Sequence, residues 1–449
     1  MLKAIERIIN EFKELSKQKT VRIISHYDTD GITAAAIIIR ALQREDRLFS
    51  VKIVRQLEAT LISEIQAEAE AKRELLLFLD LGSSNLIALS QIKTDVFVLD
   101  HHEITEKAES PNLRFINPII FEEDVSAAGL AYLFVKQLNH NNKDLASLAV
   151  IGMVGDMLEK ALSKVNNHIL KDAEDITIKR GLLIFSATRP LNKALEFSSE
   201  IFIPEVTGSS VGAINLLREA GIKTQKGRYS SIVELDSDET SRLITAIMLR
   251  RANKSNPDDS IIGNIYLIKF FNRMEDAREL STLINACSRT GSSDIALSLC
   301  LGDSRARTKA EEIYNEYKHQ IIEALNWISR SVKIEGKGYV IINAKGHIKD
   351  TIIGTVTSIL SFSGMYSEGT VLIGMAYQKD NVKVSARISG RENKTLNLQR
   401  MLNSVIKEIG GEGGGHPEAA GCIIPKEKES EFIELAKKEI ETEYMKIKL

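Results

Sequence analysis

Cysteine is scarce in this chain of 449 residues: only Cys287, Cys300 and Cys422 occur, and none belongs to a Cys-x-x-Cys pair. So few cysteines, and an odd number of them, argue against a disulfide framework and a zinc knuckle. They are typical of a reducing compartment, so we expect a cytoplasmic protein. Proline is also rare, with 7 residues, and no low-complexity linker is present, so we expect structured connections between domains.

Long apolar runs are missing as well. No stretch reaches the roughly 18 residues that span a membrane, and the opening MLKAIERIINEFKEL predicts an amphipathic helix instead of a secretory signal. The net charge is only -2, so a nucleic-acid site would have to be a local groove and not a polybasic surface. Aromatic residues make up 6% of the chain, and stacking platforms for single strands are not obvious.

Short apolar runs alternate with helical patterns up to about residue 185. The runs are VRIIS, FSVKIVR, ELLLFLDLG and TDVFVLD, and the helical patterns between them include ITAAAIIIRALQ and TLISEIQAEAEA. Strands alternating with helices predict a mainly parallel α/β sheet that is covered on both faces.

The rest of the chain is predicted to form further domains, since 449 residues are too many for one ordinary hydrophobic core. GSSVGAINLLREAG and DSDETSRLITAIMLRR predict a helical insert, and the helix that starts at DSRARTKAEEI predicts a connector about 40 Å long. Strand and helix patterns return after about residue 335. We expect a catalytic α/β domain at 1–199, a helical insert and middle region at 200–303, a connector helix at 304–333 and a smaller α/β domain at 334–449.

Acidic and imidazole side chains cluster at the ends of the apolar runs. They are His26, Asp28 and Asp30 after the first run, Asp80 after the third, Asp100, His101 and His102 after the fourth, and Asp156 in VIGMVGDMLE. Each group alone is explained by a solvated turn or a helix cap. However, the carboxyl ends of parallel strands converge on one crevice, where open α/β sheets bind ligands. We therefore predict that these groups form one site.

Five carboxylates and three imidazoles in one crevice predict bound cations, because burying so many negative charges together is very unfavourable. Oxygen and imidazole ligands without a thiolate favour Mn²⁺ or Mg²⁺ over a structural zinc site. Two ions about 4 Å apart that share a carboxylate would activate a water for in-line attack on phosphorus. These residues therefore predict two-metal hydrolysis of a phosphoester.

The last part of the chain contains GGGHP, from Gly413 to Pro417. Backbone N–H groups of such glycines can form an anion-binding nest, and His416 can donate to a phosphate, although an exposed turn has the same pattern. Ser385 and Arg387 alternate on the predicted strand KVSARIS, so they share one face. That face is either solvated or part of a substrate site.

These motifs resemble those of the DHH phosphoesterase superfamily and, within it, the RecJ-like single-strand nucleases of the archaeal branch. SHYDTDG, LDLGSS, DHH and the GDM of VIGMVGDMLE are similar to its first four motifs, and GGGHPEAAG to its DHH-associated domain. LINACSRTGSSDIALSLCLGDSRARTKAEEI resembles the RecJ segment before the connector helix. The resemblance runs from about Ile23 to Cys422.

The resemblance implies a role for each matching residue. It implies six metal ligands, with Asp80 as the bridge between two Mn²⁺ or Mg²⁺ ions: His26, Asp28, Asp30, Asp80, His101 and Asp156. Three residues would assist catalysis, His102 facing the scissile phosphate, Asp100 orienting an imidazole and Arg289 lying near the cleft. Seven would bind the substrate: Asn285, Ser385, Arg387, Gly413, Gly414, Gly415 and His416.

The sequence also departs from bacterial RecJ. Nothing predicts the extra oligonucleotide-binding barrel, the segment between the first two motifs is shorter, and the insert at about 200–275 is larger. These features resemble the archaeal branch, whose members associate with replication or repair machinery. Polarity of cleavage and the choice between DNA and RNA therefore stay open.

Four functions remain in view. The first is a metal-dependent exonuclease on single-stranded DNA or RNA, in replication or repair, with a partner protein docked on the insert and no membrane association. The second is a phosphodiesterase for short oligoribonucleotides or cyclic dinucleotides, although such enzymes are typically shorter. The third is a replisome scaffold related to the eukaryotic helicase subunit. That subunit has lost metal ligands of the family, whereas this chain has the full set, which argues against a scaffold. The fourth, a pyrophosphatase, has a wider spacing between its first histidine and aspartate.

Overall fold

The computed structural model describes residues 1–184, 186–198, 203–251, 261–363, 365–390, 396–415 and 417–448. The chain forms two compact units, one from residues 1–181 and 262–314, the other from 182–261 and 315–449.

No described helix is long and apolar enough to cross a bilayer. The three cysteines are buried and unbonded, which confirms the prediction that they form no disulfide. The four-part division of the chain stays a prediction.

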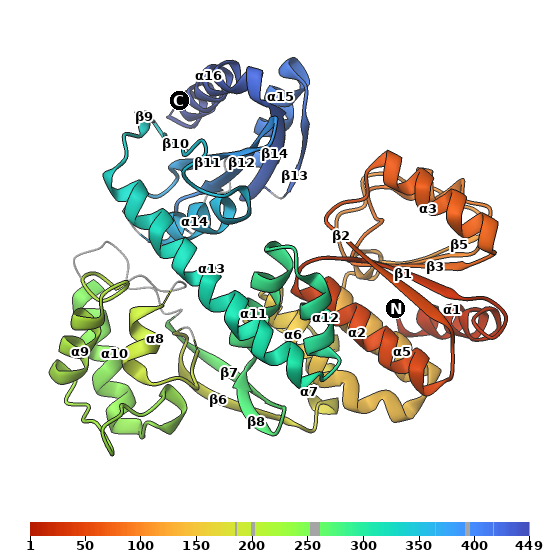
Figure 1. Ribbon diagram of the computed structural model, residues 1–449, viewed down its shortest axis with the longest axis horizontal. Helices are drawn as coiled ribbons and strands as arrows, with labels where there is room; N and C mark the ends of the chain where they lie inside the picture. Colours follow the sequence, from red (N-terminus) through yellow and green to blue (C-terminus); the bar gives the residue numbers. More distant parts are fainter. Residues whose placement is uncertain are drawn as a thin grey trace. The chain divides into compact units, whose positions relative to one another are not determined.

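A five-stranded parallel sheet forms the core of the first unit (Figure 1), in the order β2-β1-β3-β4-β5. The strands are β1 (Val21–His26), β2 (Phe49–Val54), β3 (Leu75–Leu79), β4 (Val96–Leu99) and β5 (Leu113–Ile116). The first seven helices are α1 (Leu2–Leu15), α2 (Thr29–Arg44), α3 (Ala59–Lys72), α4 (Leu86–Ser90), α5 (Ala127–Leu138), α6 (Ala146–Gly155) and α7 (Lys164–Asp172). The parallel α/β fold predicted from the alternation is confirmed.

Helices cover both faces of this sheet. Helices α3 and α4 pack on one face, where Ile65 and Leu89 join the apolar cluster of β3 and β4. On the other face, the ring of Phe12 in α1 lies edge-on to Phe97 of β4 at 5.3 Å and to Phe134 of α5 at 5.1 Å. Because both faces are covered, β3 and β4 are apolar throughout, and most of the polar side chains near the central strands lie at the strand ends.

The first unit also contains a second, three-stranded sheet. Its strands are β6 (Ile176–Leu182), β7 (Ile262–Phe270) and β8 (Arg273–Asp276), and helices α11 (Ala277–Arg289), α12 (Ser293–Cys300) and α13 (Ser304–Arg330) follow. The helical pattern between residues 200 and 275 predicted α9 (Ser210–Glu219) and α10 (Ser237–Arg251) but not β7 and β8. The predicted connector is α13, which starts in the first unit and ends in the second.

A six-stranded sheet forms the core of the second unit, in the order β13-β14-β12-β11-β10-β9. Its strands are β9 (Ile334–Gly336), β10 (Tyr339–Asn343), β11 (Val371–Gln378), β12 (Asn381–Ile388), β13 (Glu412–Gly415) and β14 (Ala419–Pro425). Helices α15 (Leu398–Ile409) and α16 (Glu429–Lys448) share an apolar cluster with the sheet, and α14 (Asp350–Phe362) packs on β11 and β12. The short helix α8 (Leu191–Glu196) packs on α9 in the insert.

The aromatic contacts of Phe12 give a test of this fold. Phe12 is 1% exposed, so Phe12→Ala leaves a cavity between α1, β4 and α5 and should lower the free energy of unfolding by about 3–5 kcal/mol. Glu6→Ala, at an exposed position of the same helix, should change it by less than about 0.5 kcal/mol. Urea unfolding followed by circular dichroism measures both, and equal effects would show that α1 does not belong to the core.

Candidate metal centre

The site lies where the chain reverses its direction of travel across the parallel sheet. Strand β1 is flanked by β2 on one side and β3 on the other. The connection after β1 leads to β2 and the connection after β3 leads to β4, so they run to opposite sides and leave a crevice at the carboxyl ends of β1 and β3. His26 is the last residue of β1, and Asp80 follows the last residue of β3. His26 and Asp80, two of the predicted metal ligands, therefore flank the position at which open α/β sheets bind ligands.

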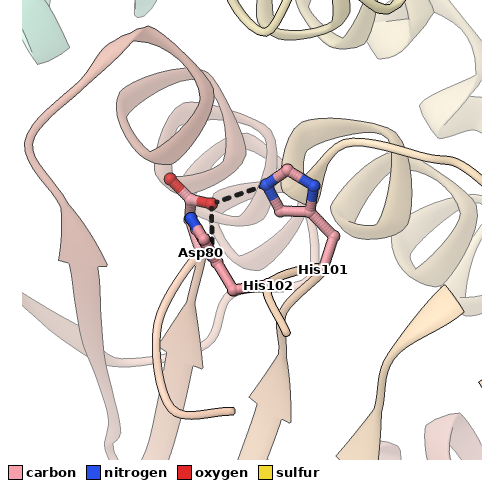
Figure 2. Close-up of side chains that lie close together, drawn as sticks. All are labelled: Asp80, His101 and His102. Atoms are coloured by element: carbon pink, nitrogen blue, oxygen red, sulfur yellow. Dashed lines mark ion pairs between the residues drawn. The ribbon is translucent and has the colours of Figure 1, made fainter. Parts of the chain in front are cut away.

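Asp80 lies at the middle of the site with a side chain that is only 1% exposed. Its Oδ2 atom is 3.1 Å from Nδ1 of His26, and its Oδ1 atom is 3.2 Å from Nε2 of His101. Figure 2 shows the carboxylate turned toward the two neighbouring histidines, His101 and His102. The backbone of Asp80 has a φ of 59°, an uncommon conformation that aspartate tolerates better than most residues.

One group of metal-binding atoms surrounds Oδ2 of Asp80. Asp28 caps the N-terminus of α2 by accepting from the N–H of Gly31 at 3.1 Å, and its other oxygen is 3.1 Å from Nδ1 of His26. The helix can begin this close to β1 because residue 31 is glycine: a Cβ there would lie 2.3 Å from the carbonyl oxygen of His26. His26, Asp28 and Asp80 form the first group, with their ligand atoms within 4.8 Å of one another.

A second group surrounds Nε2 of His101. This nitrogen is 3.2 Å from Oδ2 of Asp156 and 3.7 Å from Oδ2 of Asp30. The carboxylate of Asp30 is fully buried and accepts from the N–H groups of Ala127 and Ala128 at 2.5 and 3.0 Å, at the start of α5. The positive end of that helix therefore fixes the Asp30 carboxylate beside its like-charged neighbours.

The protonation of both groups reflects an excess of negative charge. Burial, then the charge of Asp80, raises the pKa of Asp30 to about 7. Burial, then the charge of Asp30, raises the pKa of Asp156 well above its ordinary value. Burial alone would lower the pKa of His26 and His101, but neighbouring carboxylates, Asp28 for the first and Asp80 for the second, hold both well above the usual value. All four pKa shifts favour a bound proton, as expected where negative charge is in excess.

Divalent metal ions fit these residues. Oδ1 of Asp80 is buried and has no hydrogen bond within the described part of the chain, which leaves a lone pair for a ligand. The donors are carboxylate oxygens and imidazole nitrogens, which suit Mn²⁺ or Mg²⁺. Oδ2 of Asp80 faces His26 and Oδ1 faces His101, so this carboxylate lies between the two groups, and its role as a bridge stays a prediction.

His102 and Asp100 form a pair next to these groups. Oδ1 of Asp100 is 2.8 Å from Nδ1 of His102 and accepts from the N–H of His101 at 2.8 Å, while Oδ2 accepts from the N–H of Ser83 at 2.8 Å. Burial would lower the pKa of His102, but the Asp100 hydrogen bond and charge raise it. Asp100 thus fixes the orientation of the imidazole through Nδ1, and His102 also forms a third group of potential metal-binding atoms with Asp80 and His101.

Asn117 is a residue of the site that the sequence did not single out. Its amide Nδ2 donates to the carbonyl of His102 at 2.8 Å and to Oγ of Ser83 at 2.9 Å, and the side chain is fully buried. Gly152 is another, since a Cβ at this position would lie 2.4 Å from Oδ1 of Asp30. Both residues act through contacts between segments that are far apart in the sequence. Neither belongs to a periodic pattern or a motif that could have revealed it.

Asn285 and Arg289 lie on α11, which packs against α2 and α6 of the same unit. Oδ1 of Asn285 accepts from the N–H of Thr29 at 3.0 Å, next to Asp28 and Asp30, so this side chain positions the first turn of α2. Arg289 is half-buried one turn later, and its carbonyl accepts from Arg55 at 3.5 Å. Their roles in substrate binding and catalysis stay predictions.

Ser385 and Arg387 do share the face of β12 that α14 covers. Ser385 is 5% exposed, and Arg387 donates through Nε to Oγ of Ser358 at 2.8 Å. Directly across the sheet, Ser385 pairs with Gly421, which pairs with Gly414. A Cβ on Gly414 would meet nothing within 4 Å, so the surface is open at this end of the row.

The glycine-rich stretch differs from the loop that the sequence predicted. Gly413, Gly414 and Gly415 belong to β13, an edge strand paired with β14, and not to a turn with convergent N–H groups. The glycines adopt an extended strand because the backbone of β14 provides a hydrogen-bonding partner along it. A run of glycines in a sequence does not reveal such a partner. His416 lies outside the described residues.

Three family models match the chain: the DHH family N-terminal domain at residues 20–153, the DHH-CID domain at 184–264 and the DHHA1 domain at 337–442. An uncharacterized protein of the archaeon Methanocaldococcus jannaschii, MJ0831, is 29% identical over 96% of both chains. The single-stranded-DNA-specific exonuclease RecJ of Thermus thermophilus is 28% identical over 32% of this chain and 23% of its own.

Two solved structures extend the likeness in fold. The Mn²⁺ complex of Thermus thermophilus RecJ has a TM-score of 0.62 at 18% identity over 98% of this chain, which spans 55% of that RecJ chain. CDC45 from Entamoeba histolytica has a TM-score of 0.70 at 13% identity, over 98% of this chain and 99% of its own. The chain therefore contains a DHH family N-terminal domain, a DHH-CID domain and a DHHA1 domain, in this order, and its fold is similar to those of RecJ and CDC45.

Proposed function

We propose that the protein is a metal-dependent phosphodiesterase that degrades single-stranded nucleic acid from an end, in DNA replication or repair. The DHH-family fold and its metal-binding groups support a phosphoesterase. Exonuclease action and the single-stranded substrate rest on the likeness to RecJ, whose Thermus thermophilus member is described as specific for single-stranded DNA. Mn²⁺ is the proposed metal, because that RecJ structure contains Mn²⁺.

The observation that carries this proposal is the placement of Asp80 between two groups of ligand atoms. Its Oδ2 faces His26 at 3.1 Å and its Oδ1 faces His101 at 3.2 Å. The residues of the two groups would hold a pair of divalent ions, which would polarise the phosphoryl group and lower the pKa of a bound water. Asp30 and Asp156 complete one group and Asp28 the other.

The neighbouring side chains have separate tasks in this proposal. Asp100 accepts from Nδ1 of His102, which keeps the imidazole oriented, and its hydrogen bond and charge raise the pKa of the ring and so favour the charged form. The Nε2–H of His102 then donates to a non-bridging phosphate oxygen, where a charge-assisted hydrogen bond stabilises the developing charge. Asn117 donates to the carbonyl of His102 and so fixes the backbone from which the imidazole ring extends.

The DHHA1 domain is the proposed holder of the substrate backbone. Ser385, Gly421 and Gly414 form a row across the sheet that has no large side chains at its open end; we call this row the glycine floor. Arg387 lies on the same face of β12 as Ser385. Such a floor admits a sugar-phosphate chain at close range because glycine has no Cβ.

A non-catalytic role in a replication complex is the second candidate. The specific observation in its favour is that CDC45 matches this chain over 99% of its own length. The candidate is weakened by the complete set of ligand atoms around Asp80, which a scaffold does not need. Hydrolysis of end-labelled DNA and RNA strands, beside a cyclic dinucleotide and short oligoribonucleotides, separates the scaffold from the exonuclease and from a small-substrate phosphodiesterase.

Asp80→Asn tests the proposal, because it keeps the shape of the side chain and removes the charge that two ions would share. Hydrolysis of a single strand with Mn²⁺ should fall below detection while circular dichroism stays unchanged. Asp95→Asn is the matched control: Asp95 precedes β4, at the opposite end of the sheet, and pairs with Lys19 and Arg114. Turnover of Asp80→Asn near that of the control would refute the site.

His102→Ala should lower turnover by about 10²–10³-fold, the effect of removing one electrostatic donor, and leave Mn²⁺ binding intact. Isothermal titration with Mn²⁺, beside single-turnover kinetics, measures the two properties separately. If Mn²⁺ affinity collapsed together with turnover, His102 would be a metal ligand and the roles of His101 and His102 would have to be exchanged.

The insert is the proposed docking surface for a replication or repair protein. Leu249 on α10 is 71% exposed and Val211 on α9 is 70% exposed, although both are apolar. Leu249→Glu with Val211→Glu should weaken capture of a partner from source lysate and leave hydrolysis of a free strand unchanged. Ser241→Glu, an exposed polar position of α10, is the control. An equal loss of hydrolysis and capture would assign the insert to the catalytic body instead.

A further inference from the structure

A cavity of about 610 Å³ lies in the second unit, and none of its lining residues belongs to β13 or β14. The end of α13 forms one wall with Asn326, Trp327 and Arg330, and the segment after β10 forms the other with Lys345 and His347. None of these residues is a candidate metal ligand. The volume lies within the range of about 300–1,000 Å³ that small-molecule sites occupy.

The cavity contains an aromatic platform. The indole of Trp327 and the imidazole of His347 are stacked with ring centroids 4.9 Å apart and an angle of 21° between their planes. Trp327 is half-buried, so part of its ring is open to a ligand. Val332, beside the rings, is 97% exposed, and an apolar side chain at the rim of a cavity extends the surface that a flat ligand can cover.

Two cations flank this platform. Arg330 and Lys345 are exposed, and neither forms an ion pair with another described residue. The C-terminus of α13 carries a partial negative charge of about one half, which the two full positive charges outweigh. Glu323 is the one acidic residue among the lining residues, so the wall keeps a net positive charge.

We propose that this cavity binds one nucleotide, with its base stacked on Trp327 and its phosphate held by Arg330 and Lys345. Bases stack on aromatic side chains without regard to sequence, and two unpaired cations beside the platform supply the phosphate contacts. A ligand with only an anion would not use the rings, and an apolar ligand would not use the cations. A nucleotide uses both.

This inference deepens the proposed function by naming a nucleotide of the single strand as what the second unit recognises, and it rests on that function for the choice of the strand as the source. A free mononucleotide, the product of exonuclease action, has the same chemistry. Binding at this cavity does not require hydrolysis, so the two proposals fail independently.

Trp327 is the single tryptophan of the chain, so its fluorescence reports on this cavity alone. The full-length protein is titrated in EDTA, to prevent hydrolysis, with dAMP, adenosine, inorganic phosphate and short DNA and RNA strands. We expect dAMP or the strands to quench the fluorescence, and adenosine and phosphate to act only at much higher concentration. Quenching by the strands alone would identify the strand as the source.

Variants at the cavity complete the test. Arg330→Ala with Lys345→Ala should weaken the quenching ligand about tenfold or more, the effect of losing charge-assisted hydrogen bonds. Lys309→Ala, an exposed lysine on the same helix, is the control and should bind as the wild type does. Asp80→Asn should also bind normally here, which separates this test from that of the metal centre.

The proposal is overturned if no nucleotide or strand quenches Trp327, or if inorganic phosphate quenches as well as dAMP. It is equally overturned if the double variant binds as tightly as Lys309→Ala, because the two cations would then have no part in binding.

Discussion

The mutual repulsion of carboxylates at one sheet edge is the constraint on which the rest of this structure depends. Asp30 and Asp80 are almost completely buried, and Asp28 and Asp156 lie beside them. Such a cluster is unfavourable unless positive charge accompanies it. The neighbouring carboxylates raise the pKa of the His26 imidazole and so favour its charged form, and a pKa raised to about 7 at Asp30 reduces the negative charge of the cluster. Divalent ions would compete with protons for the same oxygens, so metal affinity and proton affinity of the site are linked.

The fold holds the repelling groups in place through the backbone. The first turn of α5 donates two N–H groups to Asp30, and Gly31 and Gly152 remove side-chain volume where strands and helices must approach the ligands. Asp100 and Asn117 fix the turn that carries both histidines. The ligand geometry is thus set by buried contacts, and this allows the crevice to keep its charges close together before any ion binds.

Sequence reasoning grouped the candidate residues because His26, Asp80 and His101 end or follow apolar strands, which the covered parallel sheet makes visible as short aliphatic runs. Asp156 was grouped with them as the end of an apolar run, but that run is the buried helix α6 and not a strand. Strand β5 was not predicted, because Leu113, Arg114 and Phe115 are only half-buried and do not form a continuous aliphatic run. Strand β13 was not predicted because glycines have no side-chain pattern, and pairing with β14 decides their conformation. The contacts of Asn117 join distant segments, and a single sequence contains no trace of them. The stacked pair in the second unit was missed because Trp327 and His347 come from different elements.

The likeness to RecJ and to CDC45 poses one question, whether this crevice still holds its metal pair. The account predicts a direct answer from crystals of the full-length protein grown with Mn²⁺. Anomalous diffraction at the manganese absorption edge should show two peaks, one beside each oxygen of Asp80, with His26 and Asp28 around one peak and Asp30 and Asp156 around the other. A single peak, or none within bonding distance of Asp80, would contradict the two-metal centre on which the proposed hydrolysis depends.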